Sequence, residues 1–137
     1  MTYTEGQIQG ILLLAGIPQF KVVRIISKRG WEPRYDIKLR IPEQMLQPTV
    51  QALERLQVNC QLKRERGRRV DTIVIRRRLD VLRICDIFPR NVPSKSKVWG
   101  KFIRLMEMVR NGEHMNNDSR YEFEMILNEE NDREKET

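Results

Sequence analysis

The sequence has few of the residues that most enzymes and metal sites use. Its 137 residues include two cysteines, Cys60 and Cys85, and one histidine, His114. The cysteines form no C-x-x-C pair and His114 is distant from both, so the spacing excludes the common zinc-binding patterns. Both cysteines stand among apolar residues, which predicts small buried side chains in a reducing compartment.

Patterns for membrane insertion, export and catalysis are also missing. No apolar run reaches the length of a membrane span, and residues 1–10 resemble neither a signal peptide nor a transit peptide. The chain has no Gly-rich phosphate loop, no histidine near either cysteine, and no paired carboxylates on one helix face of its basic part. We therefore expect no membrane partner, no cofactor and no cleavable targeting segment.

Acidic residues are scarce in residues 1–112, which hold 10 Asp and Glu against 23 Lys and Arg. Residues 113–137 reverse the ratio, with 9 acidic residues against 3 basic ones, and the whole chain has a formal net charge of +7. This clustering predicts a polyanionic partner, nucleic acid before an anionic membrane surface. Residues 1–127 read as a single domain, and residues 128–137 as an acidic polar tail.

Hydrophobic periodicity predicts a leading helix, two hairpins that are each followed by a helix, and two more helices. Thr4 can cap the first helix, over residues 5–16, which is apolar nearly all round and is expected to be buried. The second helix follows Pro42 and ends near Gln57, and its regular part starts either there or only at Pro48, a residue tolerated in a first turn. The ranges of the remaining elements are strands over 20–27, 33–41, 58–66 and 70–78, and helices over 79–88, 94–112 and 117–128.

This order predicts an α+β fold, α-β-β-α-β-β-α with extra C-terminal helices, in which an antiparallel, saddle-shaped sheet has helices on one face. The strand over 33–41 alternates clearly. Tyr35, Ile37 and Leu39 face one way, and Arg34, Asp36, Lys38 and Arg40 face the other. In the last helix, Tyr121, Met125 and Ile126 are the candidates for the core-facing side.

The other face of the sheet is the candidate nucleic-acid-binding surface. Arginine outnumbers lysine in the strands and turns, and a guanidinium can bind a phosphate or a guanine edge through two hydrogen bonds. The predicted contacts are Lys21, Arg24, Lys28, Arg29, Arg34, Lys38, Arg40, Lys63, Arg64, Arg66, Arg68, Arg69, Arg76, Arg78, Lys95 and Lys97. A second predicted surface is a helix-packing interface on the first helix, made of Gly6, Gly10, Leu13 and Leu14.

Four segments together resemble one half of a LAGLIDADG homing endonuclease. Residues 8–16, IQGILLLAG, resemble the family's signature helix, and residues 33–39, PRYDIKL, resemble its second strand. Residues 95–102, KSKVWGKF, resemble the start of its late Lys-rich helix, and residues 111–115, NGEHM, resemble a common ending. Each motif is short, and their shared order carries the resemblance across nearly the whole chain.

The resemblance implies a lost catalytic centre. In the family, the signature helix ends in an acid directly before a glycine, and that acid binds the catalytic divalent metal. Here Ala15 precedes Gly16, and no acid lies between Gly6 and Glu32. Magnesium prefers oxygen ligands, and Glu5 is ten residues upstream, about 15 Å along a helix. We expect no metal site and no catalytic residue.

The resemblance therefore favours a non-catalytic protein that binds structured RNA, as an organellar ribosome component or an intron-splicing helper, with a mitochondrial location favoured. Its partners would be RNA before DNA, together with other proteins of a ribonucleoprotein assembly or a second copy through the first helix. Two alternatives stay open, an active homodimeric homing endonuclease that cuts double-stranded DNA and a sequence-specific DNA-binding regulator.

Overall fold

The computed structural model describes residues 3–25, 30–64, 71–89, 97–115 and 119–135. The chain divides into two compact units. The first unit comprises Met1–Pro18 and Asp36–Ser96, and the second comprises Gln19–Tyr35 and Lys97–Thr137. Two strands pass from one unit into the other, and each unit is described by itself below.

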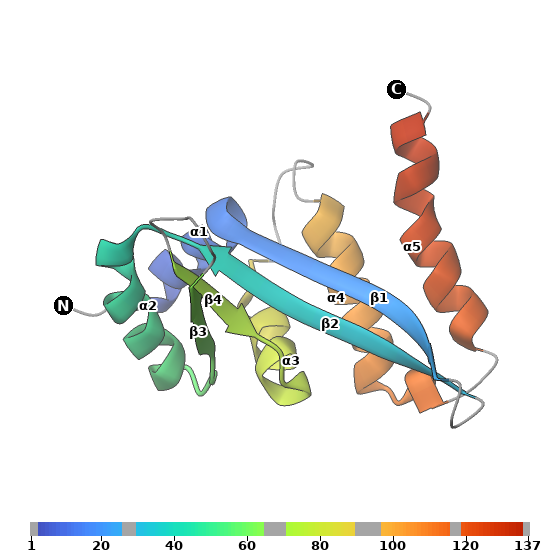
Figure 1. The fold of residues 1–137 in the computed structure, drawn as a ribbon, viewed down its shortest axis with the longest axis horizontal. Coiled ribbons are helices and arrows are strands. Elements are labelled where there is room, and N and C mark those ends of the chain that lie inside the picture. The colour runs from blue at the N-terminus through green and yellow to red at the C-terminus, as the bar shows by residue number, and fades with distance from the viewer. Residues whose placement is uncertain (1–2, 26–29, 65–70, 90–96, 116–118, 136–137) are drawn as a thin grey trace. The chain divides into compact units, whose positions relative to one another are not determined.

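The element order confirms the predicted α+β fold (Figure 1). The strands form one sheet in the order β1-β2-β4-β3. The described elements are α1 (Glu5–Ala15), β1 (Gly16–Ile25), β2 (Gly30–Arg40), α2 (Glu43–Arg55), β3 (Gln61–Arg64), β4 (Asp71–Ile75), α3 (Arg78–Ile87), α4 (Lys97–Arg110), the 3-10 helix η3 (Glu113–Met115) and α5 (Ser119–Lys135). No helix among the described residues is long and apolar enough to span a membrane.

The core of the first unit is built on the antiparallel pairing of β2 with β4. Ile37 lies opposite Ile75, and Leu39 lies opposite Ile73. All four side chains are fully buried. Helix α2 packs on β4 and on α1, and Leu53 and Ile8 are likewise fully buried. One face of these strands therefore supplies the core of the unit.

Helix α1 begins at a capping box. The Thr4 hydroxyl accepts a hydrogen bond from the backbone N–H of Gln7 at 3.2 Å, and the Gln7 side chain accepts one from the Thr4 N–H at 2.8 Å. These two bonds satisfy donors that a helix start leaves free, which confirms the predicted cap. The Gln9 side chain also donates to the carbonyl of Ile87, 2.6 Å away, and joins α1 to the end of α3.

Helix α1, which was expected to be buried, is buried on one side only. Ile8 and Leu12 are fully buried, whereas Leu14 is 90% exposed and Leu13 is 38% exposed. A helix that packs on one side only leaves the residues of its opposite side in solvent, whatever their polarity. The chain therefore presents an apolar helix face that it does not cover itself.

The structure settles two predicted boundaries near prolines, and one of them is wrong. Strand β1 begins directly after α1, at Gly16, and contains Pro18, where a loop was expected. Proline is tolerated there because β1 is an edge strand. Helix α2 begins at Glu43, directly after Pro42, so the earlier of its two expected starts is correct and Pro48 lies inside the helix. Tertiary packing at the buried Leu46 and Leu53 outweighs the helix propensity of proline.

In the second unit, aromatic rings and two helices form the core. Phe20 stacks on Tyr35 and on Phe123, with ring centroids 6.0 and 5.6 Å apart, and the Trp31 ring lies 5.2 Å from that of Phe123. Lys101 of α4 donates a hydrogen bond to the carbonyl of Leu127 in α5 at 2.6 Å. Helix α5 continues past the predicted end at Asn128 to Lys135.

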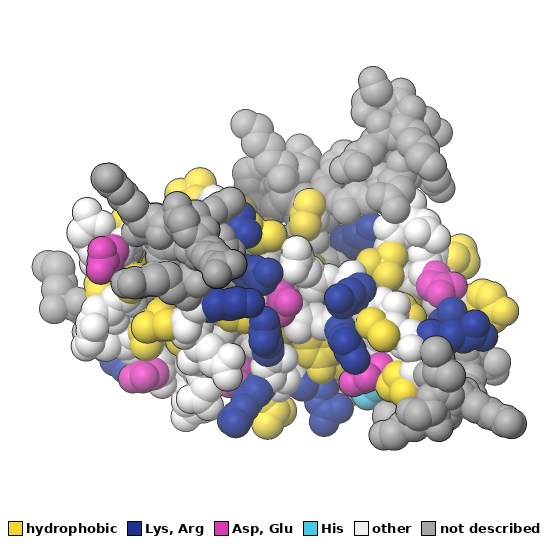
Figure 2. Space-filling view, in the orientation of Figure 1, with side chains coloured by type: hydrophobic (Ala, Val, Ile, Leu, Met, Phe, Trp, Pro, Cys, Tyr) yellow, Lys and Arg dark blue, Asp and Glu magenta, His cyan; other side chains and the backbone are white. Residues whose placement is uncertain are grey.

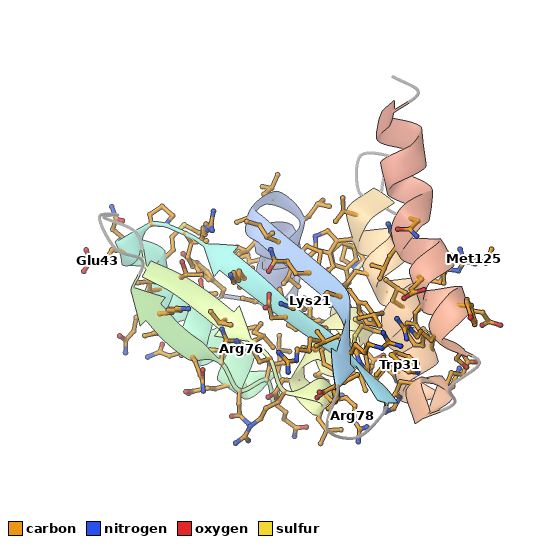
Figure 3. The ribbon with its side chains drawn as sticks, turned by 45° about the vertical axis from the view of Figure 1, so that its right-hand side comes forward. Lys21, Trp31, Glu43, Arg76, Arg78 and Met125 are labelled. Atoms are coloured by element: carbon orange, nitrogen blue, oxygen red, sulfur yellow. The ribbon has the colours of Figure 1, made fainter. Side chains whose placement is uncertain are left out.

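The predicted inner side of α5 is wrong at two of three positions. Ile126 is buried as expected, but Tyr121 is 73% exposed and Met125 is 67% exposed. Met125 projects from the outer side of α5 in Figure 3. Phe123 takes the core position, because it stacks on Phe20.

A left-handed residue ends α2. Gln57 has a φ of 64°, the described residues' one positive φ outside glycine. Its N–H donates to the carbonyl of Glu54, and the N–H of Val58 donates to the carbonyl of Leu53 at 2.8 Å. These are the two hydrogen bonds of a Schellman motif, which usually places glycine where Gln57 stands. The Asp80 side chain in α3 accepts a hydrogen bond from the N–H of Asn59 at 3.0 Å, which joins the residues after α2 to α3.

We expect Gln57→Gly to raise the free energy of unfolding by roughly 0.5 to 1 kcal/mol, because glycine adopts a positive φ without the strain of a Cβ. Urea denaturation of the purified protein measures this change. Gln51→Gly is the control, since Gln51 is exposed inside α2. That substitution should lower the free energy of unfolding by about 1 kcal/mol. A loss of stability in both variants would contradict the strain at Gln57.

Candidate nucleic-acid interface

The strands of the first unit carry a charged face opposite their core face. The register places Lys38 opposite Val74 and Arg40 opposite Thr72, and β3 places Gln61 opposite Val74 and Lys63 opposite Thr72. Arg76 directly follows Ile75, the last residue of β4, which the register pairs with Ile37. We call this set the basic face, and its members are Asp36, Lys38, Arg40, Gln61, Lys63, Thr72, Val74 and Arg76.

The middle of the basic face is neutral and buried. Thr72 is 1% exposed and Val74 is 2% exposed, whereas Arg40, Lys63 and Arg76 are exposed. Neighbouring strands lie about 4.8 Å apart, so β2 and β3 place their basic side chains about 10 Å apart across β4. Long Lys and Arg side chains can cover an apolar floor with their stems and keep their charged ends in water. The result is a neutral strip with cations along both sides.

The cations of the basic face have few partners within the chain. Among the described residues, neither a hydrogen bond nor an ion pair involves the side chain of Lys38, Lys63 or Arg76. A solvated protein face usually mixes both signs of charge, and an unpaired cation has no internal ion pair to break before it contacts a phosphate. Figure 2 shows dark blue side chains gathered over the strands, with few magenta ones between them.

The second unit adds basic residues on its own stretch of β1 and β2. Lys21 and Arg34 are exposed. Lys21 follows Phe20 and Arg34 precedes Tyr35, and the rings of Phe20 and Tyr35 stack on each other. Strand alternation turns Lys21 and Arg34 to the face opposite these rings. Lys21 is labelled in Figure 3. Arg34 lies 4.0 Å from Glu32 on the same strand, an exposed pair that contributes little to stability.

The remaining predicted contacts divide into three groups. Arg24 is exposed on β1, but strand alternation places it on the face of Phe20, so it does not join Lys21. Arg78 is the exposed first residue of α3, and the backbones of Arg64 and Lys97 lie in β3 and α4. The predicted contacts outside the described residues are Lys28, Arg29, Arg66, Arg68, Arg69 and Lys95.

The exposed side of α1 has space for another backbone. A Cβ added at Gly10 would meet no atom within 4 Å, and one at Gly6 would meet only the Thr4 hydroxyl oxygen, at 3.9 Å. Glycine inside a helix costs about 1 kcal/mol relative to alanine, and nothing in the described chain requires it at these positions. Leu13 and Leu14 are exposed beside them. All four residues of the predicted interface therefore lie at least partly in solvent.

Comparison with known proteins identifies the fold. The homing endonuclease I-TnaI matches with a TM-score of 0.75 and 19% identity, over 94% of this chain and 88% of that one. The archaeal intron-encoded homing endonuclease I-Vdi141I, complexed with DNA, matches with a TM-score of 0.74 and 13% identity, over 91% and 80% of the two chains. The LAGLIDADG homing endonuclease I-LtrWI, bound to target DNA, matches with a TM-score of 0.75 and 13% identity.

The chain has the LAGLIDADG fold. The match to I-LtrWI includes 92% of this chain but only 43% of the I-LtrWI chain, so this chain corresponds to one half of that structure. No protein-family model matches the sequence, and no curated protein matches it either. At these identities the similarity establishes the fold, and the chemistry must be argued from the residues present.

The resemblance implies a catalytic metal at the end of the first helix, and the residues there do not fit one. Ala15 is the last residue of α1 and Gly16 caps it, so neither offers a side-chain oxygen. Within the described residues, no group of three or more His, Cys, Asp and Glu could hold a metal ion. Burial, with Glu54 and Asp80 nearby, raises the pKa of the half-buried Cys60 thiol, which keeps it protonated and poorly nucleophilic at neutral pH.

Sequence reasoning missed two polar groups of the basic face. Thr72 Oγ1 and Asp36 Oδ1 are buried, and neither has a hydrogen-bond partner among the described residues. The alternation of β2 does place Asp36 beside Lys38, but its burial depends on how β2 and β4 pair. Thr72 could be assigned to this face only once the β3–β4 register was known.

We expect Lys63→Gln and Lys38→Gln each to weaken nucleic-acid binding by a similar factor for every sequence. Each should also reduce the slope of log affinity against log salt by about one, because one fewer phosphate contact releases one fewer counterion. Fluorescence anisotropy across a salt series measures both effects. Arg55→Gln is the control, since it makes the same charge change at the exposed end of α2. Equal slopes for all three variants would exclude the basic face as the contact surface.

Proposed function

We propose that this protein is a non-catalytic nucleic-acid-binding protein derived from a LAGLIDADG endonuclease, and that it binds structured RNA through its basic face. The observation that carries the proposal is Ala15 at the end of α1, where the fold's nucleases need an acid. The chain keeps the fold and the cations but lacks the metal ligand. This combination suits a protein that binds nucleic acid without cleaving it. Binding needs only the charged strands, whereas cleavage also needs the oxygen ligands of a metal.

The electrostatics of the first unit support the binding half of the proposal. Lys38, Lys63 and Arg76 have no ion pair in the described part of the chain and are available to phosphates, and Arg40 adds a guanidinium that can bind a phosphate through two hydrogen bonds. Phosphate contacts of this kind fix the position of the nucleic acid, and base contacts supply any specificity. The basic face therefore suits a polyanion whose backbone runs along the strands.

The preference for RNA and for an organelle follows from the resemblance to the LAGLIDADG family, which is common in organelles and includes members that assist splicing. A protein of this fold without a metal-binding acid fits two roles of that kind. It would serve as an RNA-binding component of an organellar ribosome or as an intron-splicing helper, with the mitochondrion as the favoured location. Both roles place the chain in a ribonucleoprotein assembly.

Two other functions each have an observation in their favour. The uncovered side of α1 favours a homodimer, the form in which an active endonuclease would cut double-stranded DNA. Two of the similar structures contain DNA, which favours a sequence-specific DNA-binding regulator. Ala15 weighs against the endonuclease, and the regulator differs from our proposal only in its target.

Crosslinking in the native cells, followed by sequencing of the bound nucleic acid, tests the proposal. We expect RNA, with ribosomal RNA in stoichiometric amount for a ribosome component and intron RNA for a splicing helper. The purified protein with magnesium should leave a duplex that contains the recovered site uncut. Recovery of DNA alone would replace the proposal by the regulator, and magnesium-dependent cleavage would replace it by the endonuclease.

We also propose that the uncovered side of α1, Gly6, Gly10, Leu13 and Leu14, packs on a protein partner or on a second copy of the chain. We expect Leu14→Asp to leave the melting temperature unchanged and to abolish that association, because Leu14 is 90% exposed in the single chain. Leu12→Asp is the contrast, since it places a charge at a fully buried position and should cost about 3 kcal/mol or more. Sedimentation velocity and thermal denaturation separate the two effects, and unchanged association in Leu14→Asp would refute the interface.

A further inference from the structure

Helix α5 carries an apolar surface that the chain leaves in solvent. Tyr121 and Met125 lie one turn apart on the same side of the helix, and their side chains are 73% and 67% exposed. The buried Phe123 and Ile126 form the opposite side, which faces the core of the unit. Neighbouring large apolar side chains in solvent mark a candidate surface for a partner. We call Tyr121, Glu122 and Met125 the α5 surface.

The charge of the α5 surface disfavours nucleic acid as its partner. Glu122 is exposed next to Tyr121, and no ion pair within the described residues involves Glu122. The surrounding sequence is acidic as well, since residues 113–137 hold 9 acidic residues against 3 basic ones. A surface of this charge repels phosphate. Its partner should therefore be a protein surface that combines apolar side chains with cations.

The outer side of α3 has this combination. Leu79 is 77% exposed, and the arginines beside it on that side, Arg78 and Arg83, are exposed. Arg77 is exposed directly before the helix. Asp86 is the exposed acid of the same side, and it is already engaged within the chain. Cations therefore outnumber acids around the exposed leucine. We call Arg77, Arg78, Leu79 and Arg83 the α3 surface.

We propose that the α5 surface of one copy of the chain packs against the α3 surface of a second copy. The side chains of Tyr121 and Met125 would meet Leu79, and the Glu122 carboxylate would meet Arg78. Opposite charges across an interface steer the two partners together and disfavour wrong pairings. This contact is separate from the proposed nucleic-acid binding and from the uncovered side of α1, because it uses other residues.

The distribution of charge along the chain favours a second copy as the partner. Residues 1–112 hold 23 basic residues against 10 acidic ones, the reverse of the balance in residues 113–137. Two copies that met through the same surface would bring like charges together. Two copies that meet through different surfaces, α5 on α3, bring opposite charges together. Such a contact joins two different patches, as heterologous interfaces do.

The contact is small, so the association should be weak. Stable interfaces use about 20 to 30 residues on each side, and the two surfaces here are much smaller. We expect a dissociation constant between about 1 μM and 1 mM. An association of this strength is measured by sedimentation equilibrium over a series of protein concentrations.

Charge reversal on each surface tests the proposal with the full-length protein, freed of nucleic acid. All proteins carry Leu14→Asp, so that association through α1 does not contribute, and this protein is the parent. Glu122→Arg and Arg78→Glu are measured separately and then mixed, with one of them labelled with a fluorophore. Glu43→Arg is the matched control, because Glu43 is an exposed acid in the first turn of α2, as Glu122 is in α5.

The variants are chosen to preserve the fold. Arg78 is the exposed first residue of α3, where an acid interacts favourably with the helix dipole. Arg83 is left unchanged, because it donates a hydrogen bond to the carbonyl of Leu56 at 3.2 Å. Leu79→Ser and Met125→Ser test the apolar part of the contact at exposed positions. Thermal denaturation confirms that each variant is folded, and the serine variants carry the test if a charge reversal is not.

We expect each of the four variants to weaken self-association of the parent by about threefold or more. The mixture of Glu122→Arg with Arg78→Glu should associate as strongly as the parent, because each protein keeps the surface that the other has lost. Glu43→Arg should associate like the parent. The proposal is overturned if the parent does not associate below about 1 mM, if Glu43→Arg loses as much, or if the mixture does not recover.

Discussion

The pairing of β2 with β4 is the constraint on which the rest of the first unit depends. Ile37 opposite Ile75 and Leu39 opposite Ile73 place four fully buried side chains on one face. The same register necessarily turns Lys38 and Arg40 to the other face. A slip of one residue would carry charges into the core and expose the isoleucines, so the hydrophobic effect that holds the core also sets the positions of the cations. One register therefore sets both the core of the unit and the positions of its cations.

Much of this arrangement could be predicted from the sequence, because it rests on periodicity. The alternation in residues 33–39 gave the two faces of β2, and the order of helices and strands gave the fold, which the similar structures confirm. The first helix was predicted over residues 5–16 and ends one residue earlier, at Ala15. These are local patterns or their sequence order, and neither requires knowledge of long-range contacts.

The errors arose where tertiary contacts decide. The composition of α1 predicted a buried helix, but the chain covers only the side of Ile8 and Leu12. Tyr121 and Met125 have apolar spacing like that of a core stripe, yet Phe123 is the residue that meets Phe20. The burial of Thr72 and the missing partner of Asp36 depend on the cross-strand register, which no single strand encodes.

Pro18 has a consequence for how such a chain can associate. β1 is an edge strand, and an edge strand offers free backbone groups to any other strand that passes. Proline has no N–H to donate, so its position on β1 interrupts the row that a foreign strand would need. A protein with exposed leucines and charged strands faces a hazard of aggregation through its sheet. Here Pro18 blunts the start of that edge against backbone pairing with a foreign strand.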